Sequence, residues 1–210
     1  MKISAIIPVK TFSKAKTRLA FPEEKKEELC KLMFKEVLQT LSVSSLIDTI
    51  IVVTKDEDAL NISKKFNVVP IIDNEESGVN HAVSLADSYA VQNGFDASIV
   101  FPQDIPFMKT QDIDFLLKFK TPPKFSLIVP SRKFDGTNAL VRMPVDLMET
   151  HYDEDSYKIH LSTGKVKAPN TSLIFVRRIM LDIDDQSDLN FALSQKEKPI
   201  LCDQILNLIH

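Results

Sequence analysis

The chain has 210 residues, of which 44% are hydrophobic and 26% are charged, and its formal net charge is −3. This length and composition are those of a soluble globular protein with a sizeable core, and we expect one domain over residues 1–210. The slightly acidic balance argues against general nucleic-acid binding, and no apolar run approaches the roughly 20 residues that span a bilayer, so we expect neither nucleic acid nor membrane as a partner.

The first half of the chain alternates short apolar segments with amphipathic ones. Segments rich in Ile and Val predict buried strands at residues 3–9 and 49–54, and further strands are predicted at residues 68–72 and 97–101. Apolar residues at helical spacing predict helices at residues 23–41, 56–66, 79–91 and 110–119. This alternation indicates βαβ units and a mainly parallel sheet, which binds ligands beyond the carboxyl ends of its strands. The loops of interest therefore follow Val9, Thr54, Ile72 and Phe101.

The second half, after Pro122-Pro123, is less regular. Its apolar segments predict strands at residues 125–130, 138–142, 172–176 and 180–183. Two helices are predicted at residues 187–193 and 200–209, and a polar, partly helical stretch at residues 151–161. The two cysteines form no metal-binding cluster and the N-terminal segment lacks the pattern of a signal peptide, so we expect a cytoplasmic protein.

A cluster of four cations follows the first predicted strand. The segment IIPVKTFSKAKTRLA holds Lys10, Lys14, Lys16 and Arg18 without an intervening carboxylate. Lysine and arginine neutralise phosphate groups, and this loop lies on the ligand side of the predicted sheet. No GxxxxGK[ST] motif is present, so side chains rather than a glycine-rich loop would hold the phosphates. A solvated basic loop without a ligand is the alternative.

Two further segments place carboxylates where a divalent cation could bind. In FPQDIPF, Asp104 follows the fourth predicted strand between two prolines, which restrict the backbone. In LDIDD, Asp182 and Asp184 are two residues apart and would share one face of a strand. Together these aspartates predict a Mg²⁺ site, because Mg²⁺ favours a few well-placed oxygen ligands. An ordinary turn and an N-cap cluster are the alternatives.

Two polar segments could contact a ligand. SGVNHAV places Gly78 and Asn80 before a helix, where glycine permits close backbone approach and an amide can contact a base edge. DGTNAL places Thr137 and Asn138 at the start of a strand, where they could hold a small anion. Ordinary helix capping and an ordinary Asp-Gly turn are the alternatives.

In this order, the segments resemble the 2-phospho-L-lactate guanylyltransferase family, which belongs to the nucleotidyltransferases of the glycosyltransferase-A-like fold. The similarity covers roughly residues 3–193 and rests on the segments PVKTFSKAKTRL, GVNHAV, QDIP, GTNAL and LDID. It implies a three-layer α/β/α fold with a mainly parallel mixed sheet, of the nucleotide-diphospho-sugar transferase-like (Rossmann-like) type.

The resemblance also implies an activity and a set of roles. GTP and 2-phospho-L-lactate would give lactyl-2-diphospho-5'-guanosine and pyrophosphate, in the biosynthesis of the deazaflavin coenzyme F-420, with Mg²⁺ as cofactor and a homodimer as the assembly. Lys10, Arg18 and Asp104 would be catalytic. The implied contacts are Lys10, Lys14, Lys16 and Arg18 to the triphosphate, Gly78 and Asn80 to guanine, Thr137, Asn138, Ser156 and His160 to the acceptor, and Asp104, Asp182 and Asp184 to the metal.

One segment departs from the family's pattern. Where the family has F-G-x-G-S-F, residues 152–157 are YDEDSY, so that Asp153 and Asp155 replace two glycines. Added negative charge beside a phosphorylated acid is unfavourable unless a metal or Lys158 offsets it. Two alternatives therefore stay open: another nucleotidyltransferase of this fold, or a GTP-binding protein without catalysis. Phosphoenolpyruvate as the acceptor, and the strictness of base selection, also stay open.

Overall fold

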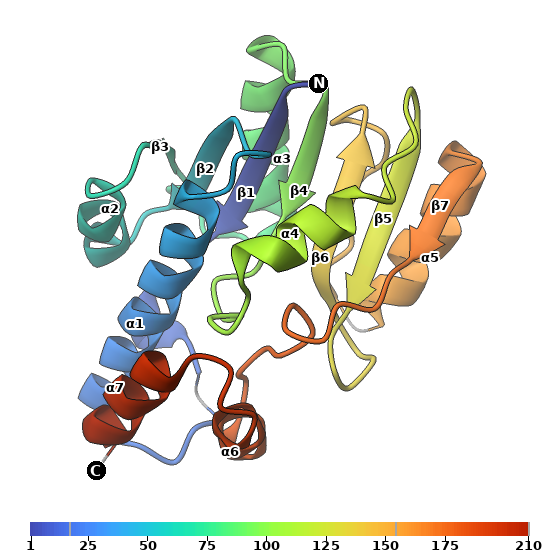
Figure 1. The fold of residues 1–210 in the computed structure, drawn as a ribbon. Coiled ribbons are helices and arrows are strands. Elements are labelled where there is room, and N and C mark those ends of the chain that lie inside the picture. Colours follow the sequence, from blue (N-terminus) through green and yellow to red (C-terminus); the bar gives the residue numbers. More distant parts are fainter. Residues whose placement is uncertain (17, 154, 210) are drawn as a thin grey trace.

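A seven-stranded mixed sheet forms the middle of three layers (Figure 1). The computed structural model describes residues 1–16, 18–153 and 155–209. The strands are β1 (Ile3–Pro8), β2 (Thr49–Thr54), β3 (Val68–Ile72), β4 (Ala97–Val100), β5 (Phe125–Pro130), β6 (Thr137–Met143) and β7 (Asn170–Leu173). Their order across the sheet is β3-β2-β1-β4-β6-β5-β7, and only β6 runs antiparallel to its neighbours. The predicted α/β class with a mainly parallel mixed sheet is confirmed.

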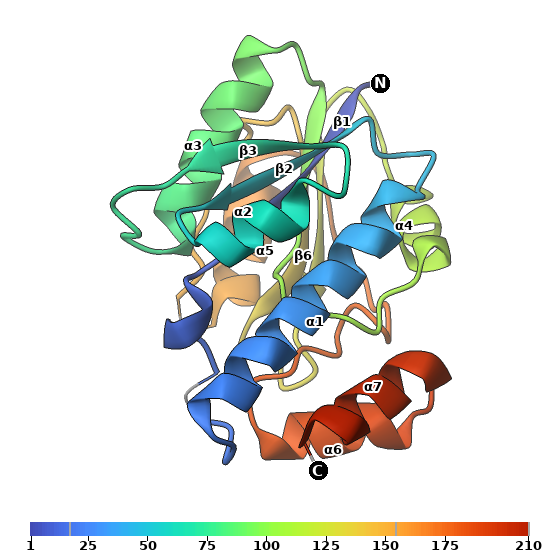
Figure 2. The ribbon, with the colours of Figure 1, turned by 90° about the vertical axis from the view of Figure 1, so that its left-hand side faces the viewer.

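Helices cover both faces of the sheet (Figures 1 and 2). One face carries α1 (Glu23–Ser42), α2 (Glu57–Ser63), α4 (Thr110–Leu117), α6 (Gln186–Ser194) and α7 (Pro199–Ile209). The other face carries α3 (Val79–Gln92) and α5 (Ser156–Lys167). Within β1, Ala5 and Ile7 pack on the side of α1, whereas Ile6 packs on the side of α3. Burial on both faces explains why this strand is an almost continuous apolar run.

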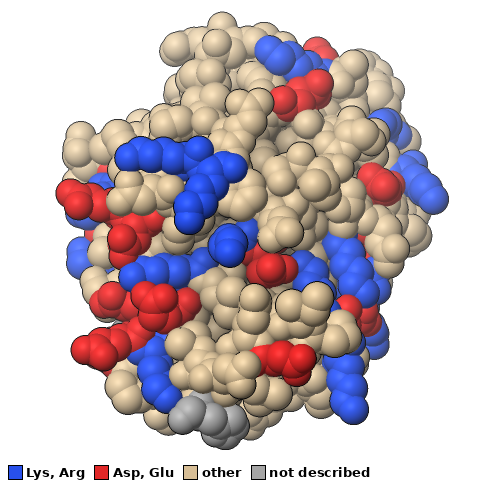
Figure 3. Space-filling model, turned by 60° about the vertical axis from the view of Figure 1, so that its left-hand side comes forward, with Lys and Arg blue, Asp and Glu red and all other residues tan. Residues whose placement is uncertain are grey.

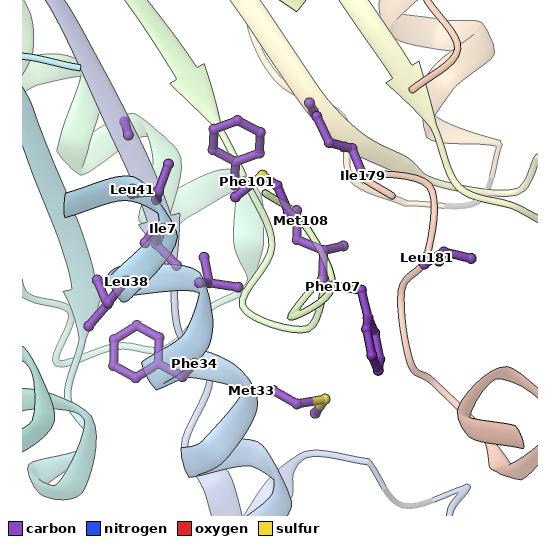
Figure 4. Packing of buried hydrophobic residues seen from close by; sticks show 14 of the residues in the cluster. Ile7, Met33, Phe34, Leu38, Leu41, Phe101, Phe107, Met108, Ile179 and Leu181 are labelled. Atoms are coloured by element: carbon purple, nitrogen blue, oxygen red, sulfur yellow. The ribbon is translucent and has the colours of Figure 1, made fainter. Parts of the chain in front are cut away.

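The larger core lies between the sheet and α1 (Figure 4). Phe34 of α1 and Ile7 of β1 are fully buried there, together with Phe101 and Phe107 from the loop after β4. Because buried aromatic side chains lie on both sides of Asp104, the core fixes the loop that carries this carboxylate.

The reversed direction of β6 determines where its first residues lie. β6 pairs antiparallel with β4, and Leu140 is opposite Val100 at the end of β4. The N-terminal end of β6 therefore lies at the same edge of the sheet as the carboxyl ends of β1 and β4. This places Thr137 and Asn138 beside the loops that the sequence predicts to bind ligands.

Two predictions for the second half need correction. The segment Met180–Ile183 is not a strand: Leu181 and Ile183 are buried, but the N–H of Ile183 donates to the carbonyl of Asp104 at 3.1 Å instead of joining the sheet. Alternating burial thus arises here from loop packing. The strand predicted at residues 172–176 is β7, which begins two residues earlier. The partly helical stretch predicted at residues 151–161 is confirmed, since α5 begins at Ser156.

Charges are distributed without a dominant sign on the face in Figure 3, where Lys and Arg side chains lie next to Asp and Glu side chains. In the part of the chain that the structure describes, no helix is both long enough and apolar enough to cross a membrane.

Candidate active site

A cavity of about 1210 Å³ lies beyond the carboxyl ends of β1, β2 and β4. The loops after β1, β3 and β4, the segment before β6 and the first residues of α3 and α5 form much of its wall. Most of the residues predicted for the site line it, namely Lys10, Lys14, Lys16, Arg18, Gly78, Asp104, Thr137, Asn138, Ser156, Asp182 and Asp184. Asn80 and His160 are not part of this lining.

The loop after β1 is held by two carboxylates from other loops. The backbone N–H of Thr11 donates to Glu76 at 2.7 Å, and that of Phe12 donates to Asp56 at 3.0 Å. Lys14 forms an ion pair with Glu76 at 2.8 Å. Burial alone would raise the pKa of Glu76, but the hydrogen bonds from Lys14 and Thr11 outweigh it and lower that pKa. The loop is therefore fixed before a ligand arrives.

Lys10 and Arg18 lie on the same loop, and neither has a carboxylate partner within residues 1–16, 18–153 and 155–209. Neither side chain forms an ion pair or a hydrogen bond with the residues that the structure describes, and both line the cavity. Their charges are available to an anionic ligand. Thr17, which lies between Lys16 and Arg18 in the predicted phosphate-binding segment, is outside the described residues.

Lys16 lies between two of the predicted metal ligands. Its Nζ is 2.5 Å from Asp104 Oδ2 and 2.7 Å from Asp184 Oδ1, and only 6% of its side chain is exposed. Burial disfavours the ammonium form, but the charges of Asp104 and Asp184 outweigh this and raise the pKa of Lys16. The positive charge between these carboxylates is thus a lysine, which has to move before a metal ion can bridge the same two oxygens.

The three aspartates come from two loops, one after β4 and one before α6. The backbone hydrogen bond from the N–H of Ile183 to the carbonyl of Asp104 joins these loops. Burial, together with the neighbouring charge of Asp104, raises the pKa of Asp182 to about 6. Among the described residues, no three His, Cys, Asp or Glu side chains are close enough to hold a metal ion as they stand. The donors nevertheless suit Mg²⁺, since Asp104 Oδ1 is buried without a hydrogen-bond partner among these residues and a cation would relieve the repulsion.

Asn138 lines the cavity, but its amide hydrogens are used within the protein. Its Nδ2 donates to Asp182 Oδ1 and to the carbonyl of Ile179, both at 3.0 Å. An amide nitrogen has two hydrogens, so neither is left for a ligand. The structure therefore shows Asn138 orienting Asp182, whereas the sequence predicts a contact to the acceptor.

A hydroxyl pair faces the cavity at the start of α5. Ser156 Oγ donates to Thr137 Oγ1 at 3.0 Å, and both residues line the cavity. Behind them, His160 Nδ1 is 3.0 Å from Thr137 Oγ1, and His160 is completely buried. His160 therefore contacts Thr137, which lines the cavity, and does not line the cavity itself.

At the start of α3, Gly78 and Asn80 have different surroundings. Gly78 lines the cavity and has a φ of 117°, a value that glycine adopts without strain. Asn80 Oδ1 instead accepts the N–H of Tyr152 at 2.8 Å. Asn80 therefore links α3 to the loop before α5, and its amide oxygen is not available to a base.

The cavity also contains residues that the sequence analysis does not single out. Asp73 directly follows β3, is buried, and lines the cavity together with Ser77, Val79 and Ala82. One of its oxygens, Oδ1, accepts the N–H of Glu76 at 3.0 Å. The position of Asp73 in the sequence could have identified it as a site residue, because it begins one of the four loops at the carboxyl edge of the sheet.

Comparison with known sequences assigns the family. The sequence model of the family described as "Guanylyl transferase CofC like" matches residues 3–197. The chain belongs to this family. A phosphoenolpyruvate guanylyltransferase from Conexibacter woesei is 30% identical to the CofC-like chain, over 90% of this chain and 86% of the relative. A 2-phospho-L-lactate guanylyltransferase from Methanobrevibacter smithii is 32% identical, over 89% of this chain and 82% of the relative.

Solved structures share the fold of the CofC-like chain. A protein from Desulfovibrio desulfuricans, proposed to be a nucleotide-diphospho-sugar transferase, superposes with a TM-score of 0.75 at 17% identity, covering 100% of this chain and 97% of the other. A nucleotidyl transferase from Methanothermobacter thermautotrophicus gives a TM-score of 0.68 at 13% identity, with 98% of each chain covered. The expected nucleotide-diphospho-sugar transferase-like fold is confirmed.

The CofC-like chain keeps a glycine-like backbone where it departs from the family's pattern. Asp155 has a φ of 57°, in the left-handed region that glycine favours and that aspartate tolerates better than most residues. Its carboxylate pairs with Lys158 at 2.9 Å, so a nearby cation offsets the added charge. Asp153 also lines the cavity, while Glu154 lies outside the described residues.

Proposed function

We propose that this CofC-like protein joins GTP to 2-phospho-L-lactate. An oxygen of the acceptor phosphate attacks the α-phosphorus of GTP, the bond from that phosphorus to the oxygen bridging the β-phosphorus breaks, and pyrophosphate leaves. The product is lactyl-2-diphospho-5'-guanosine, for coenzyme F-420 biosynthesis. The observation that carries the proposal is one cavity lined by three aspartates and by two cations, Lys10 and Arg18, that form no ion pair with the described part of the chain.

The cations of the loop after β1 would hold the triphosphate. Lys10 and Arg18 have no carboxylate partner among the described residues, and a guanidinium can bind phosphate with two parallel hydrogen bonds. Lys14 keeps Glu76 as its partner, so its charge would act on the phosphates at partial strength. We therefore expect Arg18 and Lys10 to carry most of the charge neutralisation on the departing pyrophosphate.

The reaction needs no strong general base, because the acceptor phosphate is already an anion. Catalysis then consists of holding two anions in line and neutralising their repulsion. Asp104, Asp182 and Asp184 would hold Mg²⁺, which as a Lewis acid neutralises charge on the phosphates. A cation held there would displace the ammonium of Lys16 from Asp104 and Asp184, and this ammonium could then bind substrate oxygens.

The end of the cavity beside α3 would bind guanine. Val79 and Ala82 offer apolar surface to a base, and Gly78 permits close approach. Guanine has two adjacent donors, N1–H and N2–H, and a carboxylate accepts two parallel hydrogen bonds. Asp73 is the buried carboxylate at this end, with its Oδ2 in no hydrogen bond to the described residues. We therefore propose Asp73 as the residue that selects guanine.

Phosphoenolpyruvate is the second candidate acceptor. The two relatives described above are named for different acceptors, at 30% and 32% identity. Both acceptors carry a carboxylate and a phosphate on adjacent carbons, and the hydroxyls of Thr137 and Ser156 suit the anionic oxygens of either. The proposal names 2-phospho-L-lactate because the sequence resembles that branch of the family.

Pyrophosphate release tests the proposal. GTP, CTP, UTP and ATP are each combined with 2-phospho-L-lactate and with phosphoenolpyruvate in the presence of Mg²⁺. We expect a signal only with GTP, and a larger one with phospholactate. A signal with another nucleotide would indicate a different nucleotidyltransferase of this fold. If the folded protein binds GTP but releases no pyrophosphate in any combination, the non-catalytic alternative is favoured.

A further inference from the structure

His160 is buried and does not line the cavity, yet both of its ring nitrogens have partners. The N–H of His151 donates to His160 Nε2 at 2.9 Å. A backbone N–H can only donate, so Nε2 has to be the unprotonated nitrogen of the ring. The single ring hydrogen of the neutral imidazole is therefore on Nδ1, which is 3.0 Å from Thr137 Oγ1.

The tautomer of His160 fixes what Thr137 can do. Thr137 Oγ1 accepts from His160 Nδ1 and from Ser156 Oγ, so both of its lone pairs are occupied. The hydroxyl hydrogen of Thr137 makes no hydrogen bond to the other residues that the structure describes. Thr137 is 5% exposed, and it lines the cavity. Since none of the described residues accepts this hydrogen, the hydroxyl can donate it to a ligand in the cavity.

The surroundings of His160 keep its ring neutral. Tyr152 contacts the ring edge-on with centroids 4.9 Å apart, and the nearby cation Arg142 and His151 both oppose a second proton on His160. Burial, with these neighbours, lowers the pKa of His160 to about 3. No proton can be taken up at Nε2 without losing the bond from His151. His160 is thus suited to orienting a hydroxyl and unsuited to acting as a general base.

We propose that His160 is a positioning residue, which the backbone of His151 holds in the Nδ1–H tautomer so that Thr137 donates a hydrogen bond to an anionic oxygen of the acceptor. This inference rests on the proposed function, since the acceptor is the anion expected at this end of the cavity. It assigns the network Thr137–His160–His151 a role in acceptor binding, without direct contact between His160 and the substrate.

A pair of matched variants isolates the donor at Nδ1. His160→Asn keeps an N–H close to the position of Nδ1, whereas His160→Leu removes it, and neither supplies an acceptor at the position of Nε2. We expect His160→Leu to raise KM for the acceptor about tenfold, with KM for GTP unchanged, and His160→Asn to restore most of the loss. Thermal unfolding and GTP binding show whether each variant is folded.

The dependence on Thr137 is tested with Thr137→Val, alone and together with His160→Leu. If His160 acts through Thr137, the double variant has the same acceptor KM as Thr137→Val alone. The proposal would be overturned if the acceptor KM of the double variant rose by the product of the two single effects. Equal increases of KM for GTP and for the acceptor in His160→Leu would also overturn it.

A spectroscopic measurement reads the tautomer without any substrate. Long-range ¹H–¹⁵N correlation spectra of the labelled protein should show a protonated Nδ1 and a bare Nε2 at His160 from pH 5 to pH 8. An Nε2–H tautomer or an imidazolium in that range would overturn the proposal. If the wild-type protein turns over neither acceptor, the proposed function fails, and the assignment of Thr137 to the acceptor fails with it; turnover with an unchanged acceptor KM in His160→Leu overturns the further inference alone.

Discussion

Asp104 is the side chain on which the proposed chemistry depends most. It pairs with Lys16, and its second oxygen is buried without a partner. Asp104→Asn keeps the shape but removes the charge, so we expect turnover to fall by at least about 100-fold while the fold persists. Pyrophosphate release and thermal unfolding measure these effects. Asp114→Asn, on the surface of α4, is the control, and normal Mg²⁺-dependent activity of Asp104→Asn would refute the metal assignment.

Base selection depends on Asp73 in the proposed site. Asp73→Asn still accepts the N–H of Glu76 but presents a donor where guanine also has donors. We expect kcat/KM for GTP to fall by about 10- to 100-fold relative to that for ATP, as for the loss of a bidentate contact to a base. Competition between nucleotides measures the ratio, with the exposed Glu75→Gln as control. An unchanged preference would exclude Asp73 as the selecting residue.

The buried His160 makes stability depend on pH. Its pKa is lowered to about 3 in the folded protein, whereas a histidine in the unfolded chain titrates near 6.5. Between these values only the unfolded chain binds the proton, so the free energy of unfolding falls as the pH decreases, by at most about 1.4 kcal/mol per pH unit from this group. Urea unfolding from pH 7 to pH 4 should show a shallower decline for His160→Asn. Parallel curves for the two proteins would contradict the assignment.

At the scale of elements, the loops around the cavity adopt conformations that are uncommon for their residues. Lys16, Glu76 and Asp155 all line the cavity and have positive φ values of 55°, 48° and 57°. Such strain persists where surrounding contacts fix it, as the ion pairs of Lys16 and Glu76 do here. The strained backbone thus lies in the loops after β1 and β3 and in the turn before α5, all of which line the cavity.

The turn before α5 offers a test of this strain. Asp155→Gly places glycine where φ is positive, and it removes only an exposed ion pair with Lys158. We expect the free energy of unfolding to rise by about 0.5–1 kcal/mol. Asp153→Gly is the matched control, since the backbone of Asp153 is not left-handed, and it should lower stability slightly. Urea unfolding of both variants measures these changes. A lower free energy of unfolding for Asp155→Gly would show that the Asp155 carboxylate contributes more to stability than its backbone strain costs.

At the scale of the whole molecule, α7 completes the core although it lies beyond the segment that matches the family, residues 3–197. Leu201, Cys202 and Ile205 are buried on the side of α1, so the helix docks on its own chain. Figure 2 shows α7 alongside α1. The predicted homodimer therefore does not need this face of α7, and sedimentation velocity is the measurement that tests the dimer.

The contribution of α7 to stability is a further prediction. Ile205 is completely buried, and Ile205→Ala leaves a cavity between α7 and the rest of the core. We expect a loss of about 2–4 kcal/mol in the free energy of unfolding, with KM for GTP and acceptor unchanged in the folded protein. Ile200→Ala, at a position that is 77% exposed, should change little. Similar small losses in both variants would show that α7 is not part of the cooperative core.

The sequence by itself determined the class of fold and most of the strands. The apolar residues of β2, β3 and β5 form short runs between turns, and these three strands have their predicted bounds. Asp56 is the first residue of the second predicted helix, and in the structure it is the N-cap of α2 and accepts the N–H of Ala59. These features depend on neighbours in the chain, so local patterns suffice to predict them. The cationic loop and the three aspartates were also visible, because residue type and position after a strand indicate their chemistry.

Only the tertiary structure decided which atoms remain free to act. Asn80, Asn138 and His160 have suitable side chains for a ligand, but each uses at least one polar atom on a partner nine or more residues away. Lys16 is likewise held by Asp184 from the far end of the chain. Such partners are brought together by the order of the strands and the reversed direction of β6, and no local pattern contains that information. The sequence therefore predicts most of the residues of the site, whereas the tertiary structure determines which of their polar atoms are free to bind a ligand.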